Sequence, residues 1–171
     1  MKRIAIGIMI IILLITGTAS AAKKKEPQTA WVMCQPTSEV YLRRFASKRA
    51  EVEAMLTVGT AVEWDGKKSG RWYHVIYPCE AGEGWIRGDY LSFTEPEIFE
   101  NGKIFETNRG KVLARYSIKG NVRKKLKKER RVVVFVYAEE WCVTSEGYIM
   151  TKFLTEVEDE NNPDVRDVQV R

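Results

Sequence analysis

Covalent catalysis by this chain would depend on very few side chains, because the sequence has three cysteines and one histidine. A nucleophilic cysteine needs a base, usually histidine, within hydrogen-bond reach. His74 lies five residues before Cys79, and we expect it to be an exposed residue of a strand that runs into a turn. Glu139 and Glu140 are adjacent, so in a strand their carboxylates point to opposite faces and cannot share a site.

Other catalytic signatures are also missing from the sequence. It has no Gly-x-Ser-x-Gly elbow, no glycine-rich phosphate loop and no cluster with metal-ligand spacing. We therefore expect a protein that is not an enzyme and that uses no cofactor and no metal.

Aromatic residues are the better candidates for function, through recognition. The stretch "GRWYHVIYPCEAGEGWIRGDYLS" runs from Gly70 to Ser92 and is dense in them. Side chains alternate along a strand, so if Val75 faces the core, Tyr73 points inward and Trp72 outward. An outward indole stacks on a sugar ring, a proline or an aliphatic chain. The same phase predicts that Trp141 points outward and Cys142 inward.

The alternative is that these aromatics fill the core of a very small domain, which is a common role for them. For Trp31 and Trp64 we favour this second interpretation, in the core or between repeats.

The N-terminus has the pattern of an export signal. Lys2 and Arg3 precede an apolar run from Ile4 to Ile15, and small residues end in Ala19-Ser20-Ala21. We expect residues 1–21 to be a signal peptide and residues 22–29 a polar lead-in; an uncleaved membrane anchor is the alternative. The mature protein would be in the periplasm or cell envelope, or secreted.

Short apolar runs broken by turn residues predict an all-β fold. Strands are expected at 40–42, 61–64, 72–77 and 84–86, whereas 49–56 fits either a helix or a loop ending in a strand. The second half repeats this plan. Tyr148 and Phe153 follow Trp85 and Tyr90 by 63 residues, and Trp141 follows Trp72 by 69.

A unit of this size buries a core best by curling its sheet into a small, partly open β-barrel. We expect barrel 1 over residues 30–92, a linker over 93–102, barrel 2 over 103–154 and an acidic, mobile tail over 155–171.

The unit resembles the bacterial SH3-like domain, which occurs as repeats in exported bacterial proteins. The first copy carries the family's motifs in order: "VYLR" (40–43), "AMLTVGTAVEW" (54–64), "RWYHV" (71–75), "EGWI" (83–86) and "DYLS" (89–92). The second copy matches less closely, since "EEWCV" has Cys142 where tyrosine is expected. The resemblance implies two small barrels and a non-catalytic role in binding cell-wall material or peptide segments. It also implies two aromatic grooves, the first with Trp72, Trp85, Tyr90 and Tyr41 and the second with Trp141, Tyr148 and Phe153.

Positive charge is concentrated in the second half of the chain. Residues 101–154 have 13 Lys and Arg against 5 Asp and Glu. These charges would attract wall polymers, anionic lipid or a partner protein, although many runs of charged residues are simply exposed to solvent. Export argues against nucleic acid as a partner. The expected basic patch lies within residues 122–131 and consists of Arg123, Lys124, Lys125, Lys127, Lys128, Arg130 and Arg131.

In an oxidising compartment three cysteines allow one bridge and one free thiol. We expect Cys34 and Cys79 to form a disulfide across one end of barrel 1, and Cys142 to be a buried, inert thiol.

The sequence thus favours an exported module that binds cell-wall glycan or peptide through aromatic grooves. The alternative is a protein–protein adaptor or regulatory envelope protein that docks a partner through the basic second unit. The ligand and the oligomeric state are left open by the sequence.

Overall fold

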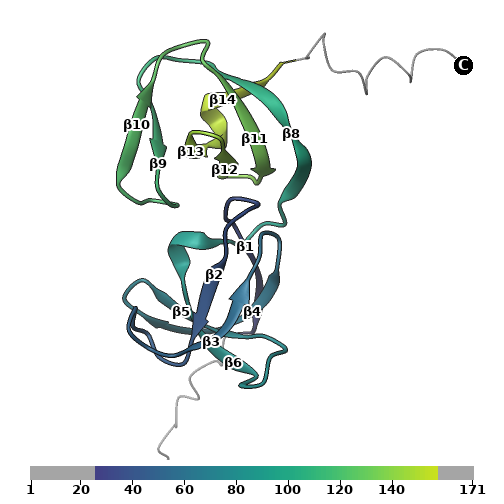
Figure 1. Cartoon of the computed structure of the whole chain (residues 1–171), viewed down its shortest axis with the longest axis vertical. Helices are drawn as coiled ribbons and strands as arrows, with labels where there is room; N and C mark the ends of the chain where they lie inside the picture. The colour runs from purple at the N-terminus through teal and green to yellow at the C-terminus, as the bar shows by residue number, and fades with distance from the viewer. Residues whose placement is uncertain (1–25, 158–171) are drawn as a thin grey trace, which may run out of the picture.

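The computed structural model describes residues 26–157, which form an all-β protein of two seven-stranded antiparallel sheets (Figure 1). The expected signal peptide, at 1–21, and residues 158–171 of the expected tail lie outside the described residues. In the described part, no helix has the length and hydropathy needed to cross a membrane.

The first sheet has the strand order β3-β2-β6-β5-β4-β1-β7. A short 3-10 helix, η1 (Gly88–Tyr90), precedes its last strand. The strands are β1 (Gln28–Val32), β2 (Val40–Arg43), β3 (Val52–Leu56), β4 (Ala61–Ser69), β5 (Trp72–Ile76), β6 (Glu83–Arg87) and β7 (Leu91–Ser92).

The second sheet has the order β10-β9-β13-β12-β11-β8-β14, which is the first order with every number raised by seven. The 3-10 helix η2 (Thr151–Phe153) again precedes the last strand, so the two halves share one topology. The strands are β8 (Glu97–Thr107), β9 (Val112–Arg115), β10 (Val122–Leu126), β11 (Arg131–Tyr137), β12 (Trp141–Thr144), β13 (Gly147–Met150) and β14 (Leu154–Glu156).

Most expected strands are present, with three differences in extent. The segment 49–56, for which helix and strand were both considered, ends in β3. Residues 97–102 of the expected linker belong to β8, and residues 155–156 of the expected tail belong to β14. Both sheets are open in strand order rather than closed into barrels.

Alternating apolar residues build a separate core on each sheet. In β11, Val132, Val134 and Val136 are buried while the residues between them are only partly covered. The core of the first sheet gathers Ala30, Val32, Cys34, Val40, Leu42, Leu56, Val62, Val75, Ile86 and Leu91. The core of the second gathers Phe105, Val112, Ala114, Leu126, Val132, Val134, Cys142, Ile149 and Leu154.

A glycine at the same place in both sheets lets two strands approach closely. A Cβ on Gly84 would lie 3.0 Å from the carbonyl oxygen of Arg43, and one on Gly147 would collide with the carbonyl oxygen of Arg115. Gly147 also has a φ of 119°, which side chains rarely adopt. This close approach accounts for the glycine of the repeated Gly-aromatic-Ile motif.

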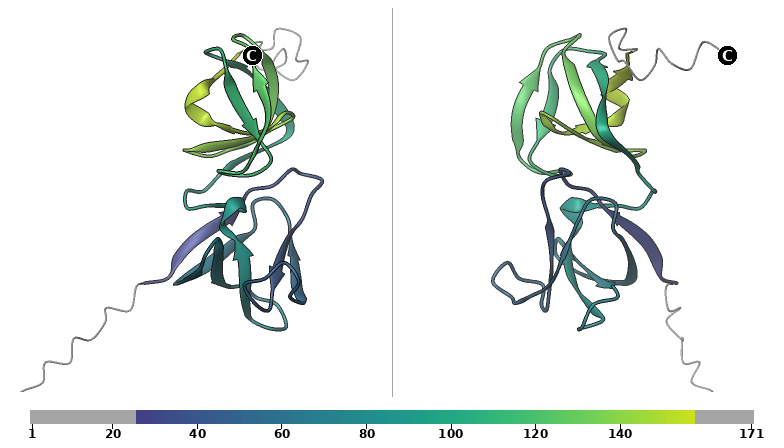
Figure 2. Two further views of the ribbon diagram at one scale, coloured as in Figure 1. Left: turned by 90° about the vertical axis from the view of Figure 1, so that its left-hand side faces the viewer. Right: turned by 45° about the vertical axis from the view of Figure 1, so that its right-hand side comes forward.

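The two sheets are stacked along the long axis of the molecule (Figure 2). A third apolar cluster lies where they meet and includes Met33 of the first half with Ile118, Val136, Ala138, Trp141, Val143 and Tyr148 of the second.

We predict that Gly147→Ala lowers the free energy of unfolding by about 1–3 kcal/mol, because the backbone of β9 has to move to admit the methyl group. Chemical denaturation measures the change. Gly110→Ala is the control, since a Cβ there meets nothing within 4 Å. An equal loss in both variants would contradict this account.

Candidate functional site

Three of the expected binding residues line one groove of about 200 Å³ on the first sheet. Tyr41 comes from β2, Trp72 from β5 and Tyr90 from η1. In β2, Val40 and Leu42 are buried and Tyr41 is 45% exposed, as strand alternation requires. Residues that are distant in sequence therefore form one aromatic surface.

Basic side chains surround this groove. Arg43, Lys48 and Arg87 line it, against the single carboxylate of Glu39. The guanidinium carbon of Arg43 lies 5.2 Å from the centre of the Tyr41 ring, a cation–π arrangement. The groove therefore combines aromatic surface with positive charge.

One side-chain N–H group of Arg87 has no hydrogen-bond acceptor among the described residues. Its Nη2 atom donates to Asp89, but its buried Nε atom has no acceptor among the described residues. A buried donor without a partner is costly. The Nε atom itself is not accessible from the groove, but the positive charge of Arg43 and Arg87 along the groove would favour a carboxylate as a ligand.

Strand alternation indicates which basic residues face the groove, although they were not among the residues predicted from the sequence. Arg43 lies two residues after Tyr41, and Arg87 is paired with Trp72 in the register of β5 and β6. Lys48 lies in the irregular loop between β2 and β3, where no such pattern applies.

Trp85 is outside this groove. It is paired with His74 across β5 and β6, and the two rings meet edge to face with centroids 5.0 Å apart. The residue is partly buried and supports the sheet beside the groove.

The expected second groove is not open. Trp141 pairs with Met150 in the second sheet as Trp72 pairs with Arg87 in the first. Trp141 is therefore the counterpart of Trp72, and Tyr148 is the counterpart of Trp85. Trp141 is only 6% exposed and Tyr148 only 4%. The prediction that Trp141 points outward into solvent is wrong, although Cys142 does point into the core.

The first half of the chain covers this face. The loop between β1 and β2 reaches the second sheet (Figure 1), where the Tyr148 hydroxyl donates to the carbonyl oxygen of Met33 at 2.7 Å. Gln35 Nε2 donates to the carbonyl oxygen of Thr144 at 2.8 Å. Burial raises the pKa of Tyr148, so the hydroxyl stays a donor. The loop after β1 thus covers the face of the second sheet that corresponds to the open groove of the first sheet.

Phe153, the third residue of the expected second groove, packs against the core of the second sheet. Two cations lie close to its ring, with Arg109 Cζ 5.0 Å and Lys152 Nζ 5.2 Å from the ring centre.

His74 is buried, which contradicts the prediction of an exposed strand residue. Its Nδ1 atom lies 2.9 Å from Asp65 Oδ2. Burial raises the pKa of Asp65, but hydrogen bonds from Lys67 and His74 more than compensate and bring it to about 2. The pair is placed by a β-bulge in β4 between Trp64 and Lys68.

The cysteines are all free in the structure, so the expected disulfide between Cys34 and Cys79 is absent. Both residues pack in the first core, and the Cys34 thiol donates to the carbonyl oxygen of Ser38. Burial raises the pKa of Cys34 and of Cys142 to about 11. Neither thiol is ionised near neutral pH, as a nucleophile would need to be.

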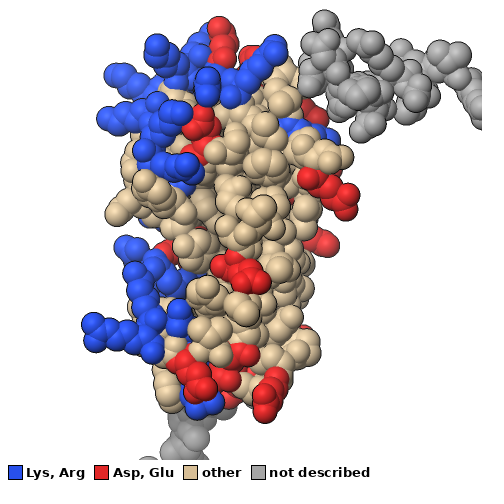
Figure 3. All heavy atoms as spheres, in the orientation of Figure 1, with Lys and Arg blue, Asp and Glu red and all other residues tan. Residues whose placement is uncertain are grey.

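The basic patch surrounds β10 and the turn that follows it (Figure 3). Part of its charge is neutralised locally, since Lys124 and Arg130 both pair with Glu146 and lower the pKa of that carboxyl. Lys125 and Lys127 form no ion pair with any described residue. The patch is therefore basic but less so than its sequence indicates.

Glu139 and Glu140 lie in the turn between β11 and β12, not in a strand. Strand alternation therefore does not apply to them, and both line a cavity between the sheets. Across residues 26–157, no group of three or more His, Cys, Asp and Glu side chains could hold a metal ion.

No family model and no curated protein matches the chain. Among solved structures, NlpC1 from Trichomonas vaginalis is 16% identical with a TM-score of 0.33, over 89% of this chain and 54% of that one. NlpC2 from the same organism is 15% identical with the same TM-score, over 80% of this chain and 52% of that one. The chain thus spans about half the length of these two structures.

We predict that Trp141→Ala lowers the free energy of unfolding by about 3–5 kcal/mol, because it opens a cavity between the sheets. Trp72→Ala should cost much less, since that indole is only partly buried. Urea denaturation of both variants gives the comparison. Equal losses would show that the two indoles have the same surroundings.

We also predict that Asp65 contributes stability that disappears in acid. The pKa of Asp65 is about 2 in the folded chain, against an ordinary value of 3.8. Its contribution to stability is therefore complete at pH values well above 3.8 and is lost as the pH falls through the pKa of the folded chain. Between about pH 5 and pH 2 the wild type should lose roughly 2 kcal/mol more than Asp65→Asn. Urea denaturation at several pH values measures this.

The control is Glu95→Gln, because Glu95 is exposed and forms no ion pair with a described residue. This variant should follow the wild-type pH profile. If Asp65→Asn follows it too, the Asp65 pair contributes nothing to stability.

Proposed function

We propose that the chain is an exported, non-catalytic binding module that recognises cell-wall or peptide material through the groove of its first sheet. The observation that carries the proposal is the convergence of Tyr41, Trp72 and Tyr90 on one groove. Flat aromatic faces bind sugar rings, prolines and aliphatic chains at low entropic cost. Export rests on the N-terminal sequence pattern.

The charge of the groove favours ligands that carry carboxylates. Arg43, Lys48 and Arg87 line it, against the single carboxylate of Glu39. A peptide component of wall material has such carboxylates, whereas a neutral glycan does not. We infer that peptide is the part of the ligand that this groove contacts.

A binding role also agrees with the state of the residues that covalent chemistry would need. The thiols of Cys34 and Cys142 have raised pKa values, and His74 is buried against Asp65 and Trp85. We further propose that each sheet is an SH3-like unit. The shared strand order and the repeated Gly-aromatic-Ile motif support this assignment.

A second candidate function is an adaptor that docks an acidic partner through the basic patch. The observation that favours it is the gathering of Lys and Arg side chains around β10 (Figure 3). The pairing of Lys124 and Arg130 with Glu146 reduces the charge available to a partner, so we place this function second.

We predict that the purified protein co-sediments with peptidoglycan sacculi and that Trp72→Ala weakens the binding roughly 30-fold, the loss typical of one central aromatic anchor. Tyr41→Ala should weaken it in the same direction. Tyr116→Ala is the matched control, because Tyr116 is 64% exposed and does not line the groove. Full binding by Trp72→Ala would exclude the groove as the site.

Salt separates the two candidate functions. Binding through the basic patch should fall steeply as ionic strength rises and should be lost in a Lys125→Glu, Lys127→Glu variant. Binding through aromatic stacking should keep most of its strength in salt and in that variant. Retention by sacculi of the charge-reversed variant but not of Trp72→Ala would support the groove.

A further inference from the structure

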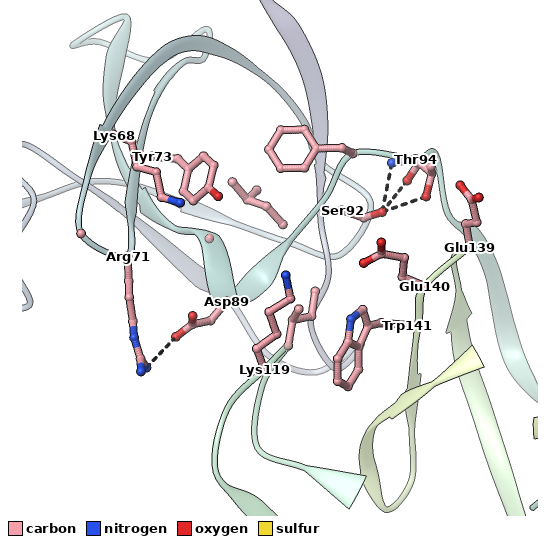
Figure 4. Close-up of a pocket in the computed structure, with 15 residues that line it drawn as sticks. Lys68, Arg71, Tyr73, Asp89, Ser92, Thr94, Lys119, Glu139, Glu140 and Trp141 are labelled. Carbon is pink, nitrogen blue, oxygen red and sulfur yellow. Dashed lines mark hydrogen bonds and ion pairs between the residues drawn. The ribbon is translucent and has the colours of Figure 1, made fainter. Parts of the chain in front are cut away.

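A cavity of about 420 Å³ lies between the two sheets, separate from the aromatic groove (Figure 4). The first half contributes the turn between β4 and β5, η1 and β7 with the residues just after it. The second half contributes the turn after β9 and the turn before β12. Its volume is within the range of pockets that bind small ligands.

Hydrogen bonds between backbone groups hold the walls of this junction cavity in place. The Ile118 N–H donates to the carbonyl oxygen of Asp89 at 3.0 Å, which joins two lining residues from different halves of the chain. The Thr151 N–H donates to the carbonyl oxygen of Glu140 at 3.1 Å. Tyr73, Leu91, Phe93 and Ile118 add apolar surface. The cavity is therefore already formed without a ligand.

The indole of Trp141 has a donor directed toward this cavity. The residue is more than nine-tenths buried, and no described residue accepts a hydrogen bond from its N–H. Figure 4 shows the indole nitrogen on the side of the ring that faces the cavity. The N–H is therefore open to the cavity and available to a ligand oxygen, in keeping with the tendency of tryptophan to pair its one donor.

Charges of both signs surround the cavity on different segments. Lys68 and Arg71 come from the turn between β4 and β5, and Lys119 comes from the turn after β9. Glu139 and Glu140 come from the turn before β12. Lys119, Glu139 and Glu140 form no ion pair with any described residue, so a ligand would not have to displace one.

We propose that the junction cavity binds a small zwitterionic ligand, a free amino acid or short peptide whose two termini are unmodified and therefore ionised. Its carboxylate accepts from the Trp141 N–H and faces the Lys119 ammonium. Its ammonium group faces Glu140. Tyr73 and Phe93 contact its apolar part. This site is independent of the aromatic groove and of the function proposed for it.

The test follows the Trp141 indole N–H signal by NMR during titration of ¹⁵N-labelled protein with the dipeptide Ala-Ala. Loss of one peak in Trp141→Phe assigns the signal. We expect this signal to shift saturably while the Trp72 indole signal stays in place. N-acetyl-Ala-Ala-amide, which lacks both charges, should cause no shift.

Two variants test the charged groups. Lys119→Ala and Glu140→Gln should each weaken binding roughly tenfold, as expected for the loss of one charge-assisted hydrogen bond. Lys125→Ala and Glu100→Gln are the matched controls, since both residues are exposed and neither lines the cavity nor adjoins a residue that does. Trp72→Ala should bind Ala-Ala as the wild type does, which separates this site from the groove.

The proposal is overturned if the Trp141 signal does not move up to the solubility limit of the dipeptide. It is also overturned if the capped dipeptide binds as well as the free one, because the charges would then play no part. Unchanged affinity in both Lys119→Ala and Glu140→Gln leads to the same conclusion.

Discussion

The structure depends on the contact between the loop that follows β1 and the aromatic face of the second sheet. Met33 is fully buried there with Trp141 and Tyr148, and the Tyr148 hydroxyl bonds the Met33 carbonyl oxygen. This contact fixes one sheet against the other. It also decides which aromatic face is covered, which stays accessible and where the junction cavity forms.

Local patterns in the sequence were sufficient to predict much of the fold. With Val75 taken as a core residue, alternation in β5 predicted that Tyr73 faces inward, and Tyr73 packs against the first core. The 63-residue spacing of Trp85 and Tyr148 indicated a repeat, and the strand order shows it. Alternation depends on neighbouring residues of one strand, and the repeat depends on the similarity of two segments. Neither prediction required knowledge of tertiary contacts.

The errors have a common physical cause. Alternation says which face of a strand a side chain occupies but not whether another element covers that face. Trp141 is on the expected face and is nevertheless buried, because a loop more than 100 residues away in sequence lies on it. His74 is buried for a similar reason, since a bulge in β4 brings Asp65 to its ring. The partners of the basic run, such as Glu146, are likewise set by strand pairing.

The filled face on the second sheet has a consequence for valency. Two equal binding surfaces on one chain would hold a repeating polymer by avidity, because the second contact would form at high effective concentration. In the part of the chain that the structure describes, one such surface is occupied by the chain's own loop. Under the proposed function, the described part of the chain would contact such a polymer through one surface of this kind, and the second sheet would support the first.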